Sequence, residues 1–209
     1  MGLPATVLKF TPEEYYRLEE SALYKSDFYR GEIYAMAGGS FRHSMITMNL
    51  GALLHQVLKG KHCRPYDGNL RLGIPEATLR CYPDVSIYCG KPEADPADRS
   101  GQTATNPTVV FEVLSPSTEA WDRGAKSAHF RQIPSLKAYV LIAQTHPRIE
   151  LYERQDDGSW RLSEAIGMDG SLKLTCVDAD LVAAEIYDGV EFDPPETLNQ
   201  APPDEFGRS

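Results

Sequence analysis

Apolar and polar residues follow two different periods along the chain, and each period predicts one kind of element. Between Ser40 and Lys59 the apolar residues recur every three or four positions, which is typical of one buried helix face; they are Ile46, Leu50, Leu53, Leu54 and Val57. Around residues 63–74 and 78–89, apolar residues alternate with polar ones, as in strands that bury one face. The stretch "KAYVLIA" at 137–143 is almost wholly apolar and predicts a buried strand.

Residues that favour helix starts place two further helices. In "FTPEEYY", Thr11 can cap a helix, Pro12 suits its first turn, and Glu14 completes a capping box. This helix is expected to end near Ala22. Another helix is predicted over about 118–132.

Turn residues predict two hairpins and one long loop. Arg30-Gly31 divides "DFYRGEIYAM" into two short strands, and Asp157-Gly158 divides "RIELYERQDDGSWRLSE" in the same way. Residues 91–108 are rich in Pro, Asp, Ser and Thr, and loops of that length are usually functional or mobile. The order of elements predicts one mixed α/β domain over residues 1–191, followed by a flexible C-terminal tail over 192–209.

Composition and charge narrow the class of protein. The chain of 209 residues is 42% hydrophobic and 24% charged, which is ordinary for a globular domain. It has no apolar run near the roughly 18 residues of a membrane span and no signal-peptide pattern, so we expect no membrane association. The net charge of −9 argues against non-specific coating of nucleic acid. It is compatible with a nuclease, because an acidic active site can lie beside a local basic groove.

The cysteines indicate a reducing compartment. Cys63, Cys81, Cys89 and Cys176 form no CxxC pair, which disfavours a zinc knuckle. Cys81 and Cys89 share one face of a predicted strand, where we expect buried, reduced thiols. The protein is therefore expected in the cytoplasm.

An acidic residue interrupts the apolar run "VVFEVL". A carboxylate such as Glu112 is costly to desolvate on a buried strand unless a partner compensates it. Asp84, in "YPDVSIY", lies on the less apolar face of an earlier strand, so adjacent strands would bring the two carboxylates together. A divalent cation would remove their repulsion, and oxygen ligands are those that Mg²⁺ prefers. A salt bridge to a basic residue is the alternative for Glu112.

Lys126 follows Glu112 on the next predicted helix. It could reach back over the strand end toward the two acids, where an ammonium would position water and offset negative charge on a phosphate. Asp122 lies four residues before it, so a pair on the helix surface is the alternative interpretation.

Three segments together resemble a known family. "YRGEIYAM…FRHS", "YPDVSIY" and "VVFEVLSPSTEAWDRGAK" are similar to the Uma2 family, also called DUF820, of restriction endonucleases in the PD-(D/E)XK nuclease superfamily. The resemblance covers roughly residues 10 to 190. It implies a restriction-endonuclease-like fold, in which helices flank a central mixed sheet.

The resemblance also implies roles for the acidic and basic residues. Asp84 matches the family's Pro-Asp element and Glu112 the first acid of the (D/E)XK element, so both are expected metal ligands, with the Val113 carbonyl as a third. The lysine of that element is replaced here by Leu114, and Lys126 is the natural substitute.

The resemblance extends to three further positions. Glu32 matches an acid that would support the metal shell, although a solvated hairpin charge is the alternative. Asp27 stands where relatives usually carry glutamate. His43 matches a histidine near a helix start, where a core histidine is the alternative.

The expected function is Mg²⁺- or Mn²⁺-dependent hydrolysis of DNA phosphodiester bonds by an endonuclease. Its catalytic residues would be Asp84, Glu112, Lys126 and Glu32. A module that binds DNA or protein without turnover, and an RNA-directed nuclease, are the alternatives. A homodimer would suit an enzyme that cuts both strands.

Overall fold

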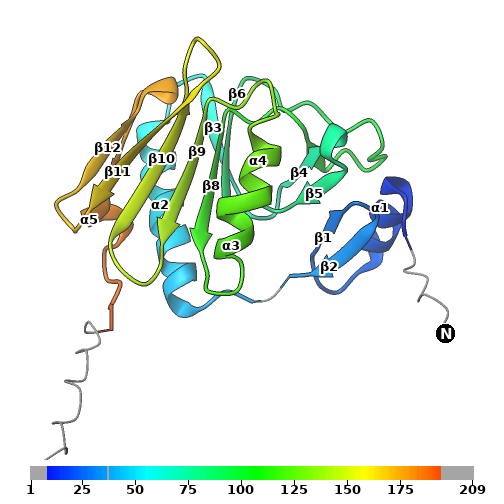
Figure 1. The fold of residues 1–209 in the computed structure, drawn as a ribbon, viewed down its shortest axis with the longest axis horizontal. Coiled ribbons are helices and arrows are strands. Elements are labelled where there is room, and N and C mark those ends of the chain that lie inside the picture. Colours follow the sequence, from blue (N-terminus) through cyan, green and yellow to red (C-terminus); the bar gives the residue numbers. More distant parts are fainter. Residues whose placement is uncertain (1–8, 37, 194–209) are drawn as a thin grey trace, which may run out of the picture.

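Two sheets of unequal size form the body of the protein. The computed structural model describes residues 9–36 and 38–193, and the expected tail lies outside the described residues from 194 onward. Figure 1 shows the larger sheet beside a smaller one that carries α1 at the far end of the molecule. Within the described ranges, no helix has the length and apolar character needed to cross a membrane.

The helices are few and mostly short. They are α1 (Pro12–Ser21), α2 (Phe41–Val57), α3 (Glu119–Trp121), α4 (Ser127–Phe130) and α5 (Ala183–Ile186), with the single turns η1 (Pro75–Ala77) and η3 (Thr175–Val177) and the π-helical segment η2 (Asp122–Lys126). The predicted capping box of α1 is confirmed, since the Thr11 side chain accepts from the Glu14 N–H and the Glu14 carboxylate from the Thr11 N–H. The helix expected over about 118–132 is divided among α3, η2 and α4.

The strands pair into three sheets. They are β1 (Ser26–Tyr29), β2 (Glu32–Ala35), β3 (Cys63–Asp67), β4 (Arg71–Ile74), β5 (Leu79–Cys81), β6 (Val85–Cys89), β7 (Thr103–Ala104), β8 (Val109–Leu114), β9 (Ala138–Ala143), β10 (Arg148–Arg154), β11 (Trp160–Ile166), β12 (Ser171–Leu174) and β13 (Ala179–Val182). The larger sheet has the order β11-β10-β9-β8-β6-β3 and the smaller one β2-β1-β5-β4-β7, while β12 pairs with β13. Both large sheets mix parallel and antiparallel neighbours.

The larger sheet is covered on both faces, because alternate residues of its central strands point to opposite sides. On one face, Val109, Phe111 and Val113 of β8 join the apolar residues of α2 and α5 in one core. On the other face, Val110 and Leu114 join Phe130 of α4 and the inner residues of β4 and β5 in a second core. Glu112 has the parity of this second face, and it therefore points toward the segment from α3 to α4.

The single strand expected over 78–89 is wrong. The chain makes β5 in the smaller sheet, breaks at residues 82–84, and continues as β6 in the larger sheet. Pro83 lies in the break. Because proline has no backbone N–H, it cannot donate a hydrogen bond to a neighbouring strand. The apolar alternation runs through both strands in step and so conceals the break. As a result, Asp84 lies at the crossing between the two sheets.

The expectation of a reduced Cys89 is also wrong. Cys63 on β3 and Cys89 on β6 are directly opposite in antiparallel register, and the two sulfurs are bonded to each other. Cys81 is a buried free thiol, as expected. The sequence could not reveal the bond, because the pairing of β3 with β6 joins residues from two separately predicted strands.

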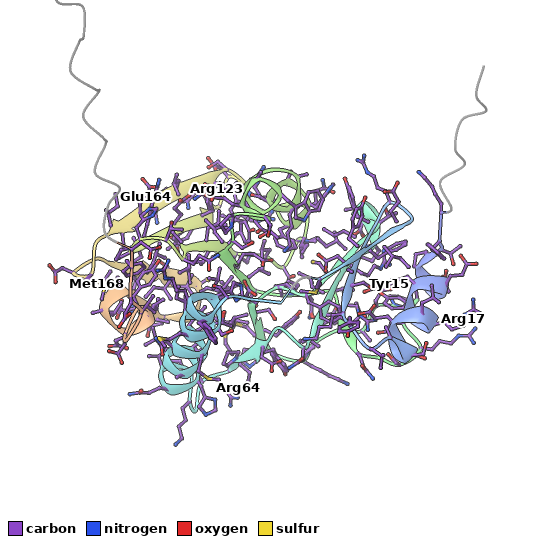
Figure 2. The ribbon with its side chains drawn as sticks, turned by 90° about the horizontal axis from the view of Figure 1, so that it is seen from below. Tyr15, Arg17, Arg64, Arg123, Glu164 and Met168 are labelled. Atoms are coloured by element: carbon purple, nitrogen blue, oxygen red, sulfur yellow. A yellow bond between two sulfur atoms is a disulfide. The ribbon has the colours of Figure 1, made fainter. Side chains whose placement is uncertain are left out.

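A buried ionic network holds α1 and the long loop onto the smaller sheet. The Arg80 guanidinium contacts Asp95 at 2.8 Å, and both residues bond the Tyr16 hydroxyl. Neighbouring Tyr15 is fully buried against Phe28. In Figure 2 Tyr15 and Arg17 mark α1 at the end of the molecule opposite Met168. The long loop over residues 91–108 is thus held on the sheet by the Arg80–Asp95 ion pair.

Candidate active site

Glu112 lies on β8, and Asp84 immediately precedes the neighbouring strand β6 rather than lying on a strand as the sequence analysis predicted. β6 and β8 are antiparallel, with Val85 opposite Phe111, so Asp84 comes one position before the paired region. The Val113 N–H donates to Asp84 Oδ2 at 2.7 Å. In antiparallel ladders the N–H and C=O of one residue face the same neighbour. The Val113 carbonyl is therefore directed toward the side where Asp84 lies.

Lys126 joins Glu112 to Asp122. Its Nζ lies 2.7 Å from Glu112 Oε1 and 3.1 Å from Asp122 Oδ1, and all three residues are buried. The pair with Asp122 had been the alternative to a contact with the strand acid, and the structure contains both. Lys126 thus bridges the helical segment and β8.

The helical segment that carries Asp122 and Lys126 is kinked. Gly124 lies between these two residues, and its angles of φ −97° and ψ −108° are not helical. Glycine is a common site of such kinks. The single helix expected over about 118–132 is therefore divided at this residue.

Burial and charge act in opposite directions on the ion pair. Burial raises the pKa of the Glu112 carboxyl, and the Lys126 ammonium opposes that rise. Burial lowers the pKa of Lys126, but Glu112 and Asp122 raise it by more, so that it lies well above its ordinary value. Because both pKa values are raised, the Glu112–Lys126 pair holds a proton at neutral pH. We assign it to the lysine, because two carboxylates face its ammonium at contact distance.

His43 contacts the other oxygen of Asp84. Its Nε2 lies 3.2 Å from Asp84 Oδ1, and this contact raises the pKa of the imidazole. Ser40 caps α2 by accepting the His43 N–H, and its hydroxyl donates to Gln144 at the end of β9. The first turn of α2 is therefore fixed beside Asp84. The sequence offered only a histidine near a helix start as the signal for this contact.

Asp27 is a further acid near the site, and the sequence indicated it only weakly. It lies on β1, and its Oδ1 is buried without a hydrogen-bond partner among the described residues. Burial raises the pKa of Asp27 to about 6, against the opposing effect of the Lys126 ammonium. Its carboxylate is therefore held at an energetic disadvantage at neutral pH.

Asp27→Asn is expected to stabilise the protein at pH 7.5 and to stabilise it much less at pH 4.5. The folded-state pKa of about 6 exceeds the ordinary 3.8, so stability is highest below pH 3.8 and falls as pH rises toward 6. The amide removes this loss, which is roughly 1–3 kcal/mol. Urea unfolding at the two pH values would measure it. An equal gain at both values would indicate packing rather than charge.

Glu32 lies on the smaller sheet. It lies on β2, the edge strand of the smaller sheet, and its Oε2 accepts from the exposed Tyr34 hydroxyl at 2.7 Å. The structure brings together four of the predicted site residues, Asp84, Glu112, Val113 and Lys126. The contact that it shows for Glu32 is the hydrogen bond from Tyr34. Its support of a metal shell stays a prediction.

One buried oxygen suits a cation. Glu112 Oε1 is buried and already faces one cation, the Lys126 ammonium at 2.7 Å. In residues 9–36 and 38–193, no three His, Cys, Asp or Glu side chains converge as a complete metal site. Mg²⁺ typically uses one or two carboxylates and completes its shell with water and phosphate oxygens. Asp84, Glu112 and the Val113 carbonyl fit that incomplete type of site.

A family model and two relatives of known sequence match most of this chain. The model of the Uma2 family, described as "Putative restriction endonuclease", matches residues 12–183. The Synechocystis sp. protein slr1290 is 39% identical over 185 residues, which cover 88% of this chain and 94% of slr1290. From the same organism, sll1609 is 35% identical over 175 residues, covering 84% and 98% of the two chains.

A solved structure has the same fold. The crystal structure of "a putative nuclease belonging to DUF820" from Anabaena variabilis aligns with a TM-score of 0.65 and 16% identity, over 84% of this chain and 96% of that chain. At this identity the likeness concerns the fold alone. It confirms the expected architecture, a mixed sheet with helices on its faces.

Proposed function

This chain belongs to the Uma2 family, and from that premise we propose that it is a divalent-metal-dependent endonuclease that hydrolyses phosphodiester bonds of DNA. The observation that carries the proposal is the trio at the crossing between the two sheets, in which Asp84 is half-buried and Glu112 and Lys126 are buried. Withdrawing such charged groups from water costs free energy. Ionisable groups in this kind of environment cluster at functional sites.

Mg²⁺ or Mn²⁺ would be held by Asp84, Glu112 and the Val113 carbonyl. When bound, the cation would lower the pKa of a water molecule and polarise the scissile phosphate. Glu112 supplies a buried carboxylate whose Oε1 faces the Lys126 ammonium. Asp84 is held in place by the Val113 N–H and by His43, so its orientation is set before any ligand arrives.

Lys126 would act on the phosphate. Its ammonium is kept protonated by Glu112 and Asp122, and a fixed positive charge stabilises the negative charge that develops on a phosphate in the transition state. Asp122 positions the ammonium from within the same helical segment. Glu32 would support the metal shell.

The direct test is cleavage of supercoiled plasmid and of linear duplex DNA with Mg²⁺ or Mn²⁺. We expect cleavage that chelation by EDTA abolishes, with internal nicks rather than loss from the ends. Degradation of RNA alone would replace the substrate with the RNA-directed alternative. Absence of cleavage on every substrate would contradict the proposal.

One observation favours a non-catalytic binding module as the second candidate. Both oxygens of Asp84 already have partners within the chain, and Lys126 is already paired with two acids. A site in this state is electrostatically satisfied. Tight DNA binding that neither needs divalent metal nor leads to cleavage would support this candidate.

The proposed activity suggests the partners of the protein, whereas its location is a separate question. DNA is the proposed substrate, and a homodimer would place two sites on the two strands of a duplex. A cytoplasmic location stays a prediction. The Cys63–Cys89 bond opposes it, because disulfides are rare in reducing compartments.

A further inference from the structure

Helix α2 carries apolar residues on two opposite faces. One face is buried against the larger sheet, and its buried residues are Ile46, Leu50, Leu53 and Leu54. Successive residues of a helix turn by about 100°, so the opposite face is formed by seven residues that are all exposed. We call them the outer face of α2, and they are Phe41, Ser44, Met45, Met48, Ala52, His55 and Gln56. A helix that is apolar on all sides is typically buried on all sides, but the described residues cover only one side of α2.

The outer face of α2 carries no charged side chain. Aspartate, glutamate, lysine and arginine make up 24% of the chain, yet Arg42 is the only one of them in α2. Arg42 lies beside the outer face and forms a two-pronged salt bridge with Asp193. The solvent side of a helix is normally charged or polar. The cores of protein interfaces, in contrast, are depleted in charge and enriched in aromatic residues and methionine.

The area of the outer face meets the need of a dimer. Phe41, Met45 and Met48 are 97%, 42% and 73% exposed. Together with the other four residues, they offer roughly 800 Å², which is the share of one partner in a standard interface. About two thirds of this area belongs to apolar residues, as in homodimer interfaces. Figure 2 shows α2 along the outside of the body, where a second molecule can reach it.

The order of residues on the outer face is self-complementary. A two-fold axis midway between Met45 and Met48 would bring residues at equal distances from that point together across two antiparallel helices. Met45 of one copy then lies beside Met48 of the other. Phe41 lies beside Ala52, so the largest side chain of the face meets its smallest. Each contact occurs twice, as a two-fold interface requires.

A second copy of the chain fits this face better than a nucleic acid or a membrane. Nucleic acid is bound largely through lysine and arginine, and helices that lie on membranes are rich in the same residues. The outer face contains neither residue. His43 lies on another side of α2, where it contacts Asp84. A partner on the outer face therefore leaves this contact undisturbed.

We propose that the outer face of α2 is a homodimer interface, in which α2 packs antiparallel on α2 of a second copy with Met45 and Met48 at the centre. This inference does not rest on the proposed nuclease activity, because exposure, charge, area and residue order carry it. It assigns a surface to the homodimer that the sequence analysis could only name.

The test is sedimentation velocity of the full chain at micromolar concentrations without nucleic acid. The parent should sediment with twice the mass of the chain. Met45→Glu and Met48→Lys should each weaken the association by more than about tenfold and yield monomers, because each would bury an unpaired charge against a methionine of the partner. Both positions are exposed in the single chain, so circular dichroism should show unchanged secondary structure.

A double variant and a control make the test specific. Met45→Glu combined with Met48→Lys should restore the dimer, because the glutamate of one copy then faces the lysine of the other in the antiparallel arrangement. Ile166→Lys is the matched control. Ile166 is 71% exposed on β11, the edge strand of the larger sheet, so its substitution should leave the dimer intact.

Four outcomes would overturn the inference. They are a parent that is monomeric at every concentration, a dimer that persists in Met48→Lys, a dimer that Ile166→Lys dissociates, and a double variant that stays monomeric. Association that requires added DNA would also overturn it and would assign the face to nucleic acid. Cleavage is measured separately. A monomeric parent that cuts DNA keeps the proposed function and loses this interface, whereas a dimeric parent that cuts nothing does the reverse.

Discussion

Glu112→Gln is expected to reduce metal-dependent cleavage by on the order of a thousandfold. The amide has nearly the size of the carboxylate, so the packing of β8 against the helical segment is kept. It carries no charge, however, so it removes the anionic oxygen that would bind the metal and that faces the Lys126 ammonium. Cleavage rates at saturating Mn²⁺, together with isothermal titration of Mn²⁺, would measure the loss. Asp84→Asn should act in the same direction.

Glu150→Gln is the matched control for this experiment. Glu150 is also a buried carboxylate on the larger sheet, and it is held by both terminal nitrogens of Arg123 at 2.6 and 2.8 Å. Its substitution disturbs an ion pair without touching Asp84 or Lys126. Cleavage by Glu150→Gln should stay within a few-fold of the parent at a temperature where both are folded. Full activity in Glu112→Gln, or an equal loss in the control, would remove Glu112 from the mechanism.

Local signals predicted those parts of the fold that depend on neighbours in sequence. The cap of α1, the hairpin at Arg30-Gly31 and the apolar stripe of α2 all arise from residues a few positions apart, and the structure contains each of them. The acid in β8 was informative for the same reason. A single carboxylate in an apolar run stands out against its immediate neighbours, and it indicated a compensating partner.

Features that depend on distant pairing were not predictable. Whether a strand crosses from one sheet to the other at Pro83 is decided by tertiary contacts, which the alternation pattern does not record. The same holds for the pairing of Cys63 with Cys89 and for the burial of Asp27, whose surroundings come from other parts of the chain. These residues meet their partners only when strands from distant parts of the chain pair into sheets.

Lys126→Met is expected to destabilise the protein by about 3–5 kcal/mol and to abolish cleavage. Methionine fills a similar volume, so the loss comes from charge. Glu112 and Asp122 would remain buried without their ammonium, which is the situation that breaking a buried ion pair produces. Urea unfolding at pH 7.5 would measure the stability. A loss below about 1 kcal/mol would mean that water reaches the pair.

The pH dependence of this loss distinguishes charge from packing. The Lys126 ammonium lowers the pKa of Glu112 against the effect of burial, so removing it raises that pKa further. A carboxyl with a raised folded-state pKa keeps its stability below its unfolded value near 4.3 and loses it as the pH rises. The destabilisation of Lys126→Met should therefore be small near pH 4 and large at pH 7.5.

Adding Glu112→Gln to Lys126→Met isolates the contribution of the pair. The double variant buries one carboxylate fewer than Lys126→Met, so it should recover part of the lost stability at pH 7.5, with a coupling of roughly 1–3 kcal/mol between the two sites. Its cleavage should stay absent, because both the charged oxygen and the ammonium are gone. Recovery of stability without recovery of activity would show that the pair is retained for chemistry and not for the fold. If the two destabilisations simply add, Lys126 and Glu112 are not coupled, and the lysine would have to be assigned to Asp122 alone.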